Sequence, residues 1–140
     1  MITPLGPDDV AAAVALWTEA GLTRPWNDAA GDFLRAVDGP ASVVLGIRTD
    51  GELLGSAMVG HDGHRGWVYY LAVAASHRKQ SVGRALMHEA ERLLIERGCP
   101  KLNLMVRSGN AEVIAFYRAL GYVQDDVVTL GRRLISDDGA

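Results

Sequence analysis

The middle of the chain constrains the fold most strongly, because an apolar strand there leads through a short loop into a long helix. Residues 67–74 are apolar on both faces, which is typical of a central strand, and residues 76–81 are polar and basic. An amphipathic helix is expected over residues 82–97. Its apolar stripe consists of Val82, Leu86, Ala90, Leu93 and Leu94. The first backbone N–H groups of such a helix have no partner within the helix and favour an anion, usually a phosphate.

The remaining periodicities predict helices and strands in the order α-α-β-β-β-α-β-α-β-β. The expected helices run from Pro7 to Gly21 and over residues 28–37, 82–97 and 111–120, with Asn27 and Asn110 as N-caps. The expected strands cover residues 42–48, 53–60, 67–74, 101–106, 122–124 and 127–134. We interpret this order as a mixed α/β sheet with helices packed on it. A chain of 140 residues with 49% hydrophobic residues fits a single domain, residues 1–140.

Composition excludes several classes of partner. With 14 Lys and Arg against 17 Asp and Glu, the net charge is −3, whereas nucleic-acid-binding domains are usually basic. No apolar run approaches the ~18 residues of a membrane span, and the N-terminus lacks the pattern of a signal peptide. A single cysteine, Cys99, fits a reducing compartment. We therefore expect a cytoplasmic protein with no nucleic-acid or membrane partner, and scattered histidines without metal-site spacing predict no metal.

Basic residues surround the start of the predicted helix 82–97. Arg78, Lys79 and Arg84 add positive charge there, and Gly83 allows a large anion to approach the backbone. Neither G-x-x-x-x-G-K-[ST] nor a G-x-G-x-x-G after a strand occurs, which excludes two common nucleotide motifs. From spacing alone, a solvated basic loop is an equally weighted alternative to a phosphate site.

Two blocks of residues carry a resemblance to a known family. The first block has the pattern Leu-x-Val, then [Arg/Gln]-x-x-Gly-x-[Gly/Ala], and is met by Leu71, Val73, Arg78, Ser81 and Gly83. The second block, Asn-x-x-x-x-x-Phe-Tyr-x-x-x-Gly-[Phe/Tyr], is met by Asn110, Phe116, Tyr117, Gly121 and Tyr122. Together with the order of elements, these blocks resemble the GCN5-related N-acetyltransferases, the GNAT family. The resemblance covers nearly the whole chain.

The resemblance implies both a fold and an activity. The fold is the α/β (α+β) GNAT fold, a mixed, mostly antiparallel sheet of six to seven strands flanked by about four helices and splayed between its central strands. The activity is transfer of an acetyl group from acetyl-CoA to a primary amine by direct attack. The amine belongs to a small molecule, a protein N-terminus or a lysine, and a homodimer is a habit of the family. Residues 24–28, 62–66, 98–101 and 130–135 are similar to a bacterial subgroup, the YpeA-type acetyltransferases.

The resemblance also implies which residues hold the cofactor. The pyrophosphate of acetyl-CoA would lie at the start of helix 82–97, and its pantetheine arm would run along strand 67–74. The implied cofactor-binding residues are Leu71, Ala72, Val73, Arg78, Lys79, Gln80, Ser81, Val82, Gly83, Arg84, Ala85, Asn110 and Phe116. Ser81 departs from the family, which has glycine there. Its Cβ is expected to crowd the pyrophosphate, or to strain the loop if φ is positive, so that acetyl-CoA binds more weakly.

Two residues are candidates for proton transfer. Tyr117 stands where the family places the general acid that protonates the CoA thiolate; the alternative is an aromatic residue that only packs beside Phe116. Many relatives carry a glutamate as base on the strand before the cofactor loop, but residues 67–70 contain no carboxylate. His64, near Asp62 at the entrance of that strand, is therefore the candidate base.

The acceptor side is expected between the first two helices. Its candidate residues are Arg24, Trp26, Asn27 and Asp28, with Tyr69 and Tyr70 either lining the acceptor cleft or lying in the core. An equally weighted alternative makes Arg24 and Asp28 a surface ion pair and Trp26 a hydrophobic plug. Two further functions stay open at this point, namely a protein N-terminal acetyltransferase of the ribosomal-alanine type and a non-catalytic acyl-CoA-binding module.

Overall fold

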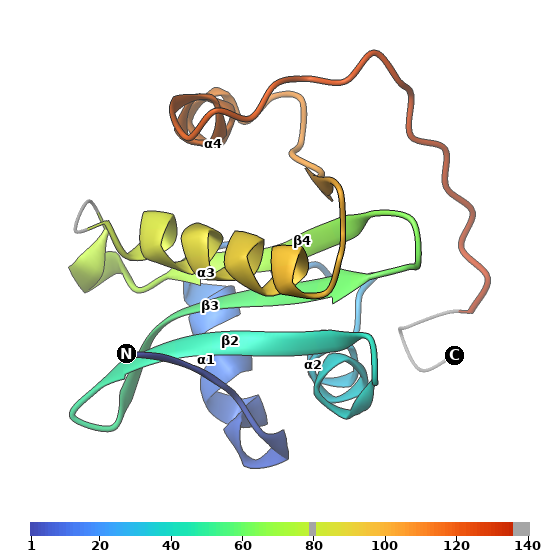
Figure 1. Cartoon of the computed structure of the whole chain (residues 1–140). Helices are drawn as coiled ribbons and strands as arrows, with labels where there is room; N and C mark the ends of the chain where they lie inside the picture. The colour runs from blue at the N-terminus through green and yellow to red at the C-terminus, as the bar shows by residue number, and fades with distance from the viewer. Residues whose placement is uncertain (79–80, 136–140) are drawn as a thin grey trace.

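The computed structural model describes residues 1–78 and 81–135, and within them it shows one sheet flanked by helices (Figure 1). The strands are β1 (Ile2–Pro4), β2 (Ser42–Thr49), β3 (Glu52–His61), β4 (Gly66–Val73) and β5 (Leu102–Leu104). The helices are α1 (Val10–Glu19), α2 (Ala29–Asp38), α3 (Val82–Glu96) and α4 (Ala111–Ala119), with 3-10 turns η1 (Pro7–Asp9) and η2 (Ala75–His77). None of the helices described is both long and apolar enough to cross a lipid bilayer.

The sheet has the order β1-β2-β3-β4-β5. Neighbours are antiparallel from β1 to β4, and only β4 and β5 run parallel. The turn between β2 and β3 contains an Asp-Gly pair, whose φ angles are 52° at Asp50 and 80° at Gly51. The mixed, mostly antiparallel sheet that the resemblance implies is confirmed.

The sheet opens between β4 and β5. These strands pair only where Gly66–Val68 face Leu102–Leu104. Beyond Val68, β4 continues to Val73 with no partner from β5. The edge of β4 is therefore exposed where the two strands diverge, as the expected splay of the central strands requires.

A bulge in β4 sits next to this opening. Ser56 faces Ala72 and Met58 faces Tyr69, so two residues of β4 oppose Ala57 alone. Tyr70 in the bulge has a φ of 52°, which costs an ordinary residue roughly 1–3 kcal/mol. Packing holds it there, because the Tyr70 ring stacks on Trp17 with centroids 3.9 Å apart. Trp17 Nε1 in turn donates to Ser56 Oγ at 2.8 Å.

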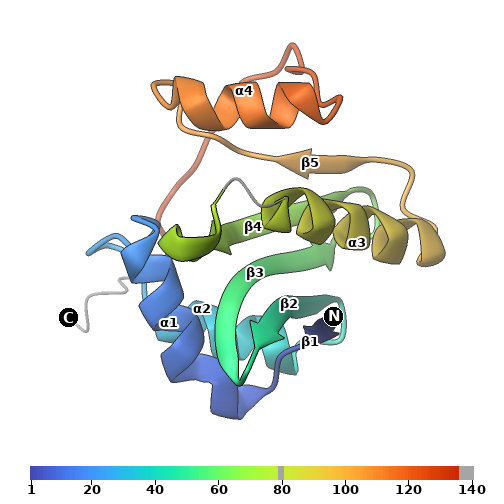
Figure 2. The ribbon, with the colours of Figure 1, turned by 90° about the vertical axis from the view of Figure 1, so that its left-hand side faces the viewer.

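Helices cover the sheet in two layers. Trp17 of α1 and Phe33 of α2 pack with Val44 on one face, whereas Leu86 of α3 packs with Leu45 on the other. Val44 and Leu45 are consecutive in β2, so its alternating side chains pack into the hydrophobic clusters on both faces of the sheet. Figure 2 shows α1 and α3 on opposite sides of the sheet, with α4 above β5. The opening between β4 and β5 thus lies between the α1–α2 layer and the α3–α4 layer.

The expected helices and inner strands are confirmed to within a few residues, but the ends of the chain differ from expectation. The strands predicted over residues 122–124 and 127–134 are wrong, because this segment is irregular, and the described sheet has five strands rather than six or seven. β1 was not predicted, and β5 is shorter than residues 101–106. The apolar residues of the C-terminal segment are exposed: Val123, Val127, Val128, Leu130, Leu134 and Ile135. Their alternation suits a strand, yet a strand also needs a partner, and none pairs with this segment in the described structure.

Side-chain N-caps mark where α2 and α4 begin. Asp28, not Asn27, caps α2, since its Oδ1 accepts from Gly31 N at 2.9 Å. Asn110 caps α4 as predicted, accepting from Val113 N at 3.2 Å.

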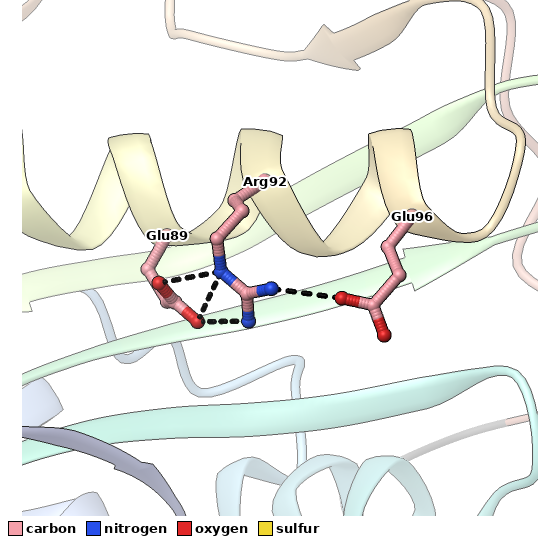
Figure 3. Close-up of polar contacts among 3 residues, drawn as sticks. All are labelled: Glu89, Arg92 and Glu96. Atoms are coloured by element: carbon pink, nitrogen blue, oxygen red, sulfur yellow. Dashed lines mark hydrogen bonds and ion pairs between the residues drawn. The ribbon is translucent and has the colours of Figure 1, made fainter.

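The exposed face of α3 carries an ion-pair network (Figure 3). Arg92 forms ion pairs with Glu89 at 2.6 Å and with Glu96 at 2.8 Å. Glu91, also on α3, accepts a hydrogen bond from the Tyr122 hydroxyl. Such surface pairs add little to stability, so α3 depends mainly on its buried stripe.

Candidate active site

A cavity of about 1280 Å³ lies where β4 and β5 diverge. Its walls come from both layers of helices. On the α3–α4 side they include Val82, Gly83, Arg84, Asn110, Phe116 and Tyr117. On the α1–α2 side they include Arg24, Asn27, Asp32 and Arg35. The opening in the sheet therefore connects two surfaces that the sheet would otherwise separate, and two ligands can meet inside it.

The start of α3 forms one end of this cavity. Val82, Gly83 and Arg84 belong to the first turn of α3, whose leading N–H groups and positive dipole end favour an anion. No acidic residue lies in that turn. Arg78, whose Nε donates to Val73 O at 3.2 Å, also lines the cavity. Of the other predicted cofactor residues, Ala85 does not line the cavity, and Lys79 and Gln80 fall outside the described residues.

Ser81 has the strained conformation that makes glycine the usual residue in this family pattern. Its φ is 66° and its ψ is 14°, in the left-handed region. A residue with a Cβ pays about 1–2 kcal/mol for this conformation. The side chain makes no capping hydrogen bond that would offset the cost. The expectation of strain at a positive φ is thus met.

Gly83 brings three elements close together. A Cβ built on Gly83 would lie 3.2 Å from Phe116 Cζ and 3.7 Å from Val73 Cγ2. The first distance is tighter than an ordinary contact, so a side chain at this position would require the Phe116 ring to shift by a few tenths of an ångström. Glycine at this position therefore lets α3 pack against both α4 and β4, and this contact helps to shape the cavity wall.

The exposed edge of β4 forms the floor of the cavity. Leu71, Ala72 and Val73 line it, and they lie in the part of β4 that β5 does not pair. An unpaired strand edge offers backbone N–H and C=O groups to an extended ligand, which can bind as an added strand.

Tyr117 reaches the cavity from α4. The residue is 9% exposed, and burial raises the pKa of its phenol to about 12. Edge-on contacts with Phe116 and Tyr122, at centroid distances of 5.1 and 5.8 Å, fix the ring. Its hydroxyl has no hydrogen bond within the described structure, where every fully buried side-chain nitrogen or oxygen has a partner. The hydroxyl is therefore protonated at neutral pH and accessible to a ligand, even though the ring packs beside Phe116.

Tyr70 links β4 to α2. It lines the cavity from the bulge, and its hydroxyl donates to Asp32 Oδ2 at 2.9 Å. The other carboxylate oxygen of Asp32 accepts from Arg35 Nη1 at 3.1 Å. Tyr69 also lines the cavity, and burial, with a smaller contribution from the charge of Asp62, raises its pKa. Sequence reasoning missed Asp32 and Arg35, because only the bulge turns Tyr70 towards α2.

Only some of the candidate acceptor residues on the loop between α1 and α2 line the cavity. Arg24 and Asn27 line the cavity, whereas Trp26 and Asp28 do not. Trp26 is half exposed and lies under Arg107, with the guanidinium 5.9 Å from the ring centroid. Arg107, on the loop between β5 and α4, lines the cavity and was also missed. This contact joins the α1–α2 loop to the β5–α4 loop.

His64 and Asp62 lie away from the cavity. Both belong to the turn between β3 and β4, and neither is among the lining residues. Asp62 accepts from the backbone N–H groups of His64 and Arg65 and from Trp67 Nε1, and these bonds lower its pKa to about 2. The structure therefore uses Asp62 to hold the turn, and it does not bring His64 to the site. Within the described ranges, no group of His, Cys, Asp and Glu side chains is arranged to hold a metal ion.

The fold and the site together define an acyltransferase architecture: a sheet that opens beside a parallel strand pair, an anion-binding helix start and a buried phenol. The chain belongs to the acetyltransferase (GNAT) family, whose model matches residues 11–122. It is therefore an acetyltransferase of the GNAT type, as the sequence resemblance predicted.

Similar sequences and solved structures of the same fold are also acetyltransferases. An acetyltransferase of Pectobacterium atrosepticum is 45% identical over 93% of this chain and 92% of its own, and an uncharacterized N-acetyltransferase of Yersinia pestis is 43% identical with the same coverage. AAC(6')-Iy in complex with a CoA bisubstrate analogue superposes with a TM-score of 0.80 at 15% identity, over 96% of this chain and 98% of that one. The ribosomal-protein-S18-alanine N-acetyltransferase of Escherichia coli has a TM-score of 0.74 and 26% identity, over 86% and 76% of the two chains.

Proposed function

We propose that this protein transfers the acetyl group of acetyl-CoA to a primary amine by direct attack, with Tyr117 as the general acid. The observation that carries the proposal is the cavity itself, which runs through the opening of the sheet and is lined from both helix layers. The α3–α4 side would hold the cofactor, and the α1–α2 side would hold the acceptor.

The residues of the α3–α4 side fit acetyl-CoA. The first turn of α3, with Arg78 and Arg84, suits the pyrophosphate. The free edge of β4 at Leu71–Val73 suits the amide-bearing pantetheine arm, which can pair with it like a strand. When bound, acetyl-CoA supplies an acetyl group activated as a thioester. The solved complex of AAC(6')-Iy with a CoA analogue supports this assignment through the shared fold.

Tyr117 fits the role of proton donor. Tyr117 lines the cavity, and its raised pKa of about 12 keeps the proton on the phenol at neutral pH. A donor beside the sulfur can neutralise the thiolate as it leaves. Backbone N–H groups along the β4 edge can stabilise negative charge on the thioester oxygen. We do not assign the base to His64, because that residue lies in the turn between β3 and β4, outside the cavity.

Release of CoA in the presence of amines tests this function. Purified protein, acetyl-CoA and a panel of primary amines should give amine-dependent thiol release and an acetylated product of the expected mass. The variant Tyr117→Phe serves as the matched control, because it keeps the ring and removes only the hydroxyl. CoA binding without transfer to any amine would instead support a non-catalytic acyl-CoA-binding module.

A protein N-terminus remains the second candidate acceptor. Its support is the structural match to the Escherichia coli ribosomal-protein-S18-alanine N-acetyltransferase, at 26% identity. The amine panel therefore includes a short peptide with an N-terminal alanine. Faster transfer to that peptide than to any small amine would favour this second function.

A further inference from the structure

The α1–α2 side of the cavity is cationic. Arg24 and Arg35 line it against one carboxylate, that of Asp32, and the neighbouring β5–α4 segment adds Arg107 and Glu112, so three guanidinium groups face two carboxylates. This balance is unusual for a site that must receive an amine, since a free amine is an ammonium ion at neutral pH. The surplus positive charge therefore needs a chemical reason.

Much of the hydrogen-bonding capacity of these arginines is unused. Arg35 donates a hydrogen bond from Nη1 to Asp32, and its side chain is 74% exposed. Arg107 stacks on Trp26 and makes no ion pair within the part of the chain described here. Arg24 directs Nη1 to the carbonyls of Gly21 and Thr23, each at 2.8 Å. Arg35 and Arg107 thus retain N–H donors that suit a carboxylate.

The Asp32 carboxylate of α2 already has hydrogen-bond partners on both oxygens. One oxygen accepts from Arg35 and the other from the Tyr70 hydroxyl. Its negative charge is therefore partly neutralised by a neighbour on the same helix. It does not convert the α1–α2 side into a site for a polycation.

We propose that the acceptor is a primary amine that itself carries a carboxylate, as an amino acid or an acidic peptide N-terminus does. Arg107 and Arg35 would bind the carboxylate, and the amine would point through the opening towards Tyr117. This inference rests on the proposed acetyl transfer. It separates the chain from solved structures of the same fold that are named aminoglycoside acetyltransferases, because an aminoglycoside is a polycation.

Matched acceptors that differ in one carboxylate test the proposal. Lysine is compared with cadaverine, its decarboxylated form, and glycine with glycinamide. We expect kcat/KM to be at least tenfold higher for each member that has the carboxylate. Two peptides, one beginning Ala-Asp-Glu and one beginning Ala-Lys-Lys, distinguish a peptide source from a free amino acid. Equal or better turnover of cadaverine and the basic peptide would overturn the proposal.

Charge variants locate the effect. Arg107→Gln should raise KM for the carboxylate acceptor about tenfold while KM for acetyl-CoA is unchanged, and Arg107→Glu should shift the preference towards cadaverine. Arg118→Gln is the matched control, because Arg118 is an exposed arginine of α4 that does not line the cavity. Arg35→Gln, on a different element, repeats the test. Loss of acetyl-CoA turnover with every amine would count against the proposed function, whereas turnover without a carboxylate preference would count against this inference alone.

Discussion

The two sides of the cavity present different chemical groups to a ligand. The α3–α4 side offers mainly backbone, namely the first turn of α3 and the free edge of β4, and α3 packs closely against α4 at Gly83. The α1–α2 side offers charged side chains, namely Asp32 and Arg35 on α2 and Arg24 on the loop before it. A backbone site binds a feature common to all acyl-CoA molecules, whereas side chains select one acceptor. We therefore expect changes on the two sides to separate cofactor binding from acceptor choice.

The largest expected effect lies at Tyr117, where the two sides meet. Tyr117→Phe should lower kcat about 100-fold, because it removes the proton donor and keeps the ring contacts. The affinity for CoA, measured by calorimetry, should stay within a factor of two. Unchanged turnover would remove Tyr117 from the mechanism and leave its role as packing.

The same residue predicts a pH dependence of stability. Burial raises the pKa of Tyr117 from 10.0 to about 12, so folding favours the neutral phenol. Its contribution of about 2–3 kcal/mol is therefore full below pH 10 and is lost as the pH rises towards 12. Urea unfolding of the wild type at pH 8 to 11.5 should show this loss, and Tyr117→Phe should show a smaller one. Identical slopes in the two proteins would contradict the shifted pKa.

A larger side chain at Gly83 should damage the α3–α4 side alone. Gly83→Val crowds the Phe116 ring, so we expect a loss of about 1–3 kcal/mol of stability and at least tenfold weaker CoA binding. Gly109→Val is the control, since nothing lies within 4 Å of a Cβ at Gly109. Equal effects of the two substitutions would show that contact with α4 is unimportant.

A change at Tyr70 should affect the α1–α2 side alone. Tyr70→Phe keeps the stack on Trp17 and removes the hydrogen bond to Asp32. We expect KM for the acceptor to rise about threefold to tenfold, as the loss of one such bond implies, while KM for acetyl-CoA stays constant. A parallel rise in both KM values would break the distinction between the two sides.

The smallest expected effect is a gain at Ser81. Ser81→Gly relieves a positive φ of 66° and should stabilise the protein by about 1 kcal/mol, with CoA binding several-fold tighter. Ser108→Gly is the control, because Ser108 is not among the residues with positive φ and should gain nothing from the change. A destabilised Ser81→Gly variant would show that the serine hydroxyl matters more than the strain.

Sequence reasoning succeeded where the signal is local. Periodicity placed the four helices and the inner strands, and the strand–loop–helix string located the anion-binding end of the cavity. It failed over residues 122–134, where apolar alternation predicted strands that find no partner in the described structure. Strand pairing depends on a distant segment, so alternation alone cannot guarantee it. The single domain, the cytoplasmic location and the homodimer stay predictions.

The amino-acid sequence by itself determined the GNAT family, the long amphipathic helix with its basic entrance, and the positions of Tyr117 and Ser81. These follow from residue types at short spacing, which act through local backbone geometry. Only the tertiary structure decided that a bulge joins Tyr70 to Asp32, that Arg107 reaches across to Trp26, and that His64 stays outside. Each of these depends on segments far apart in the chain meeting in space, which no local pattern encodes.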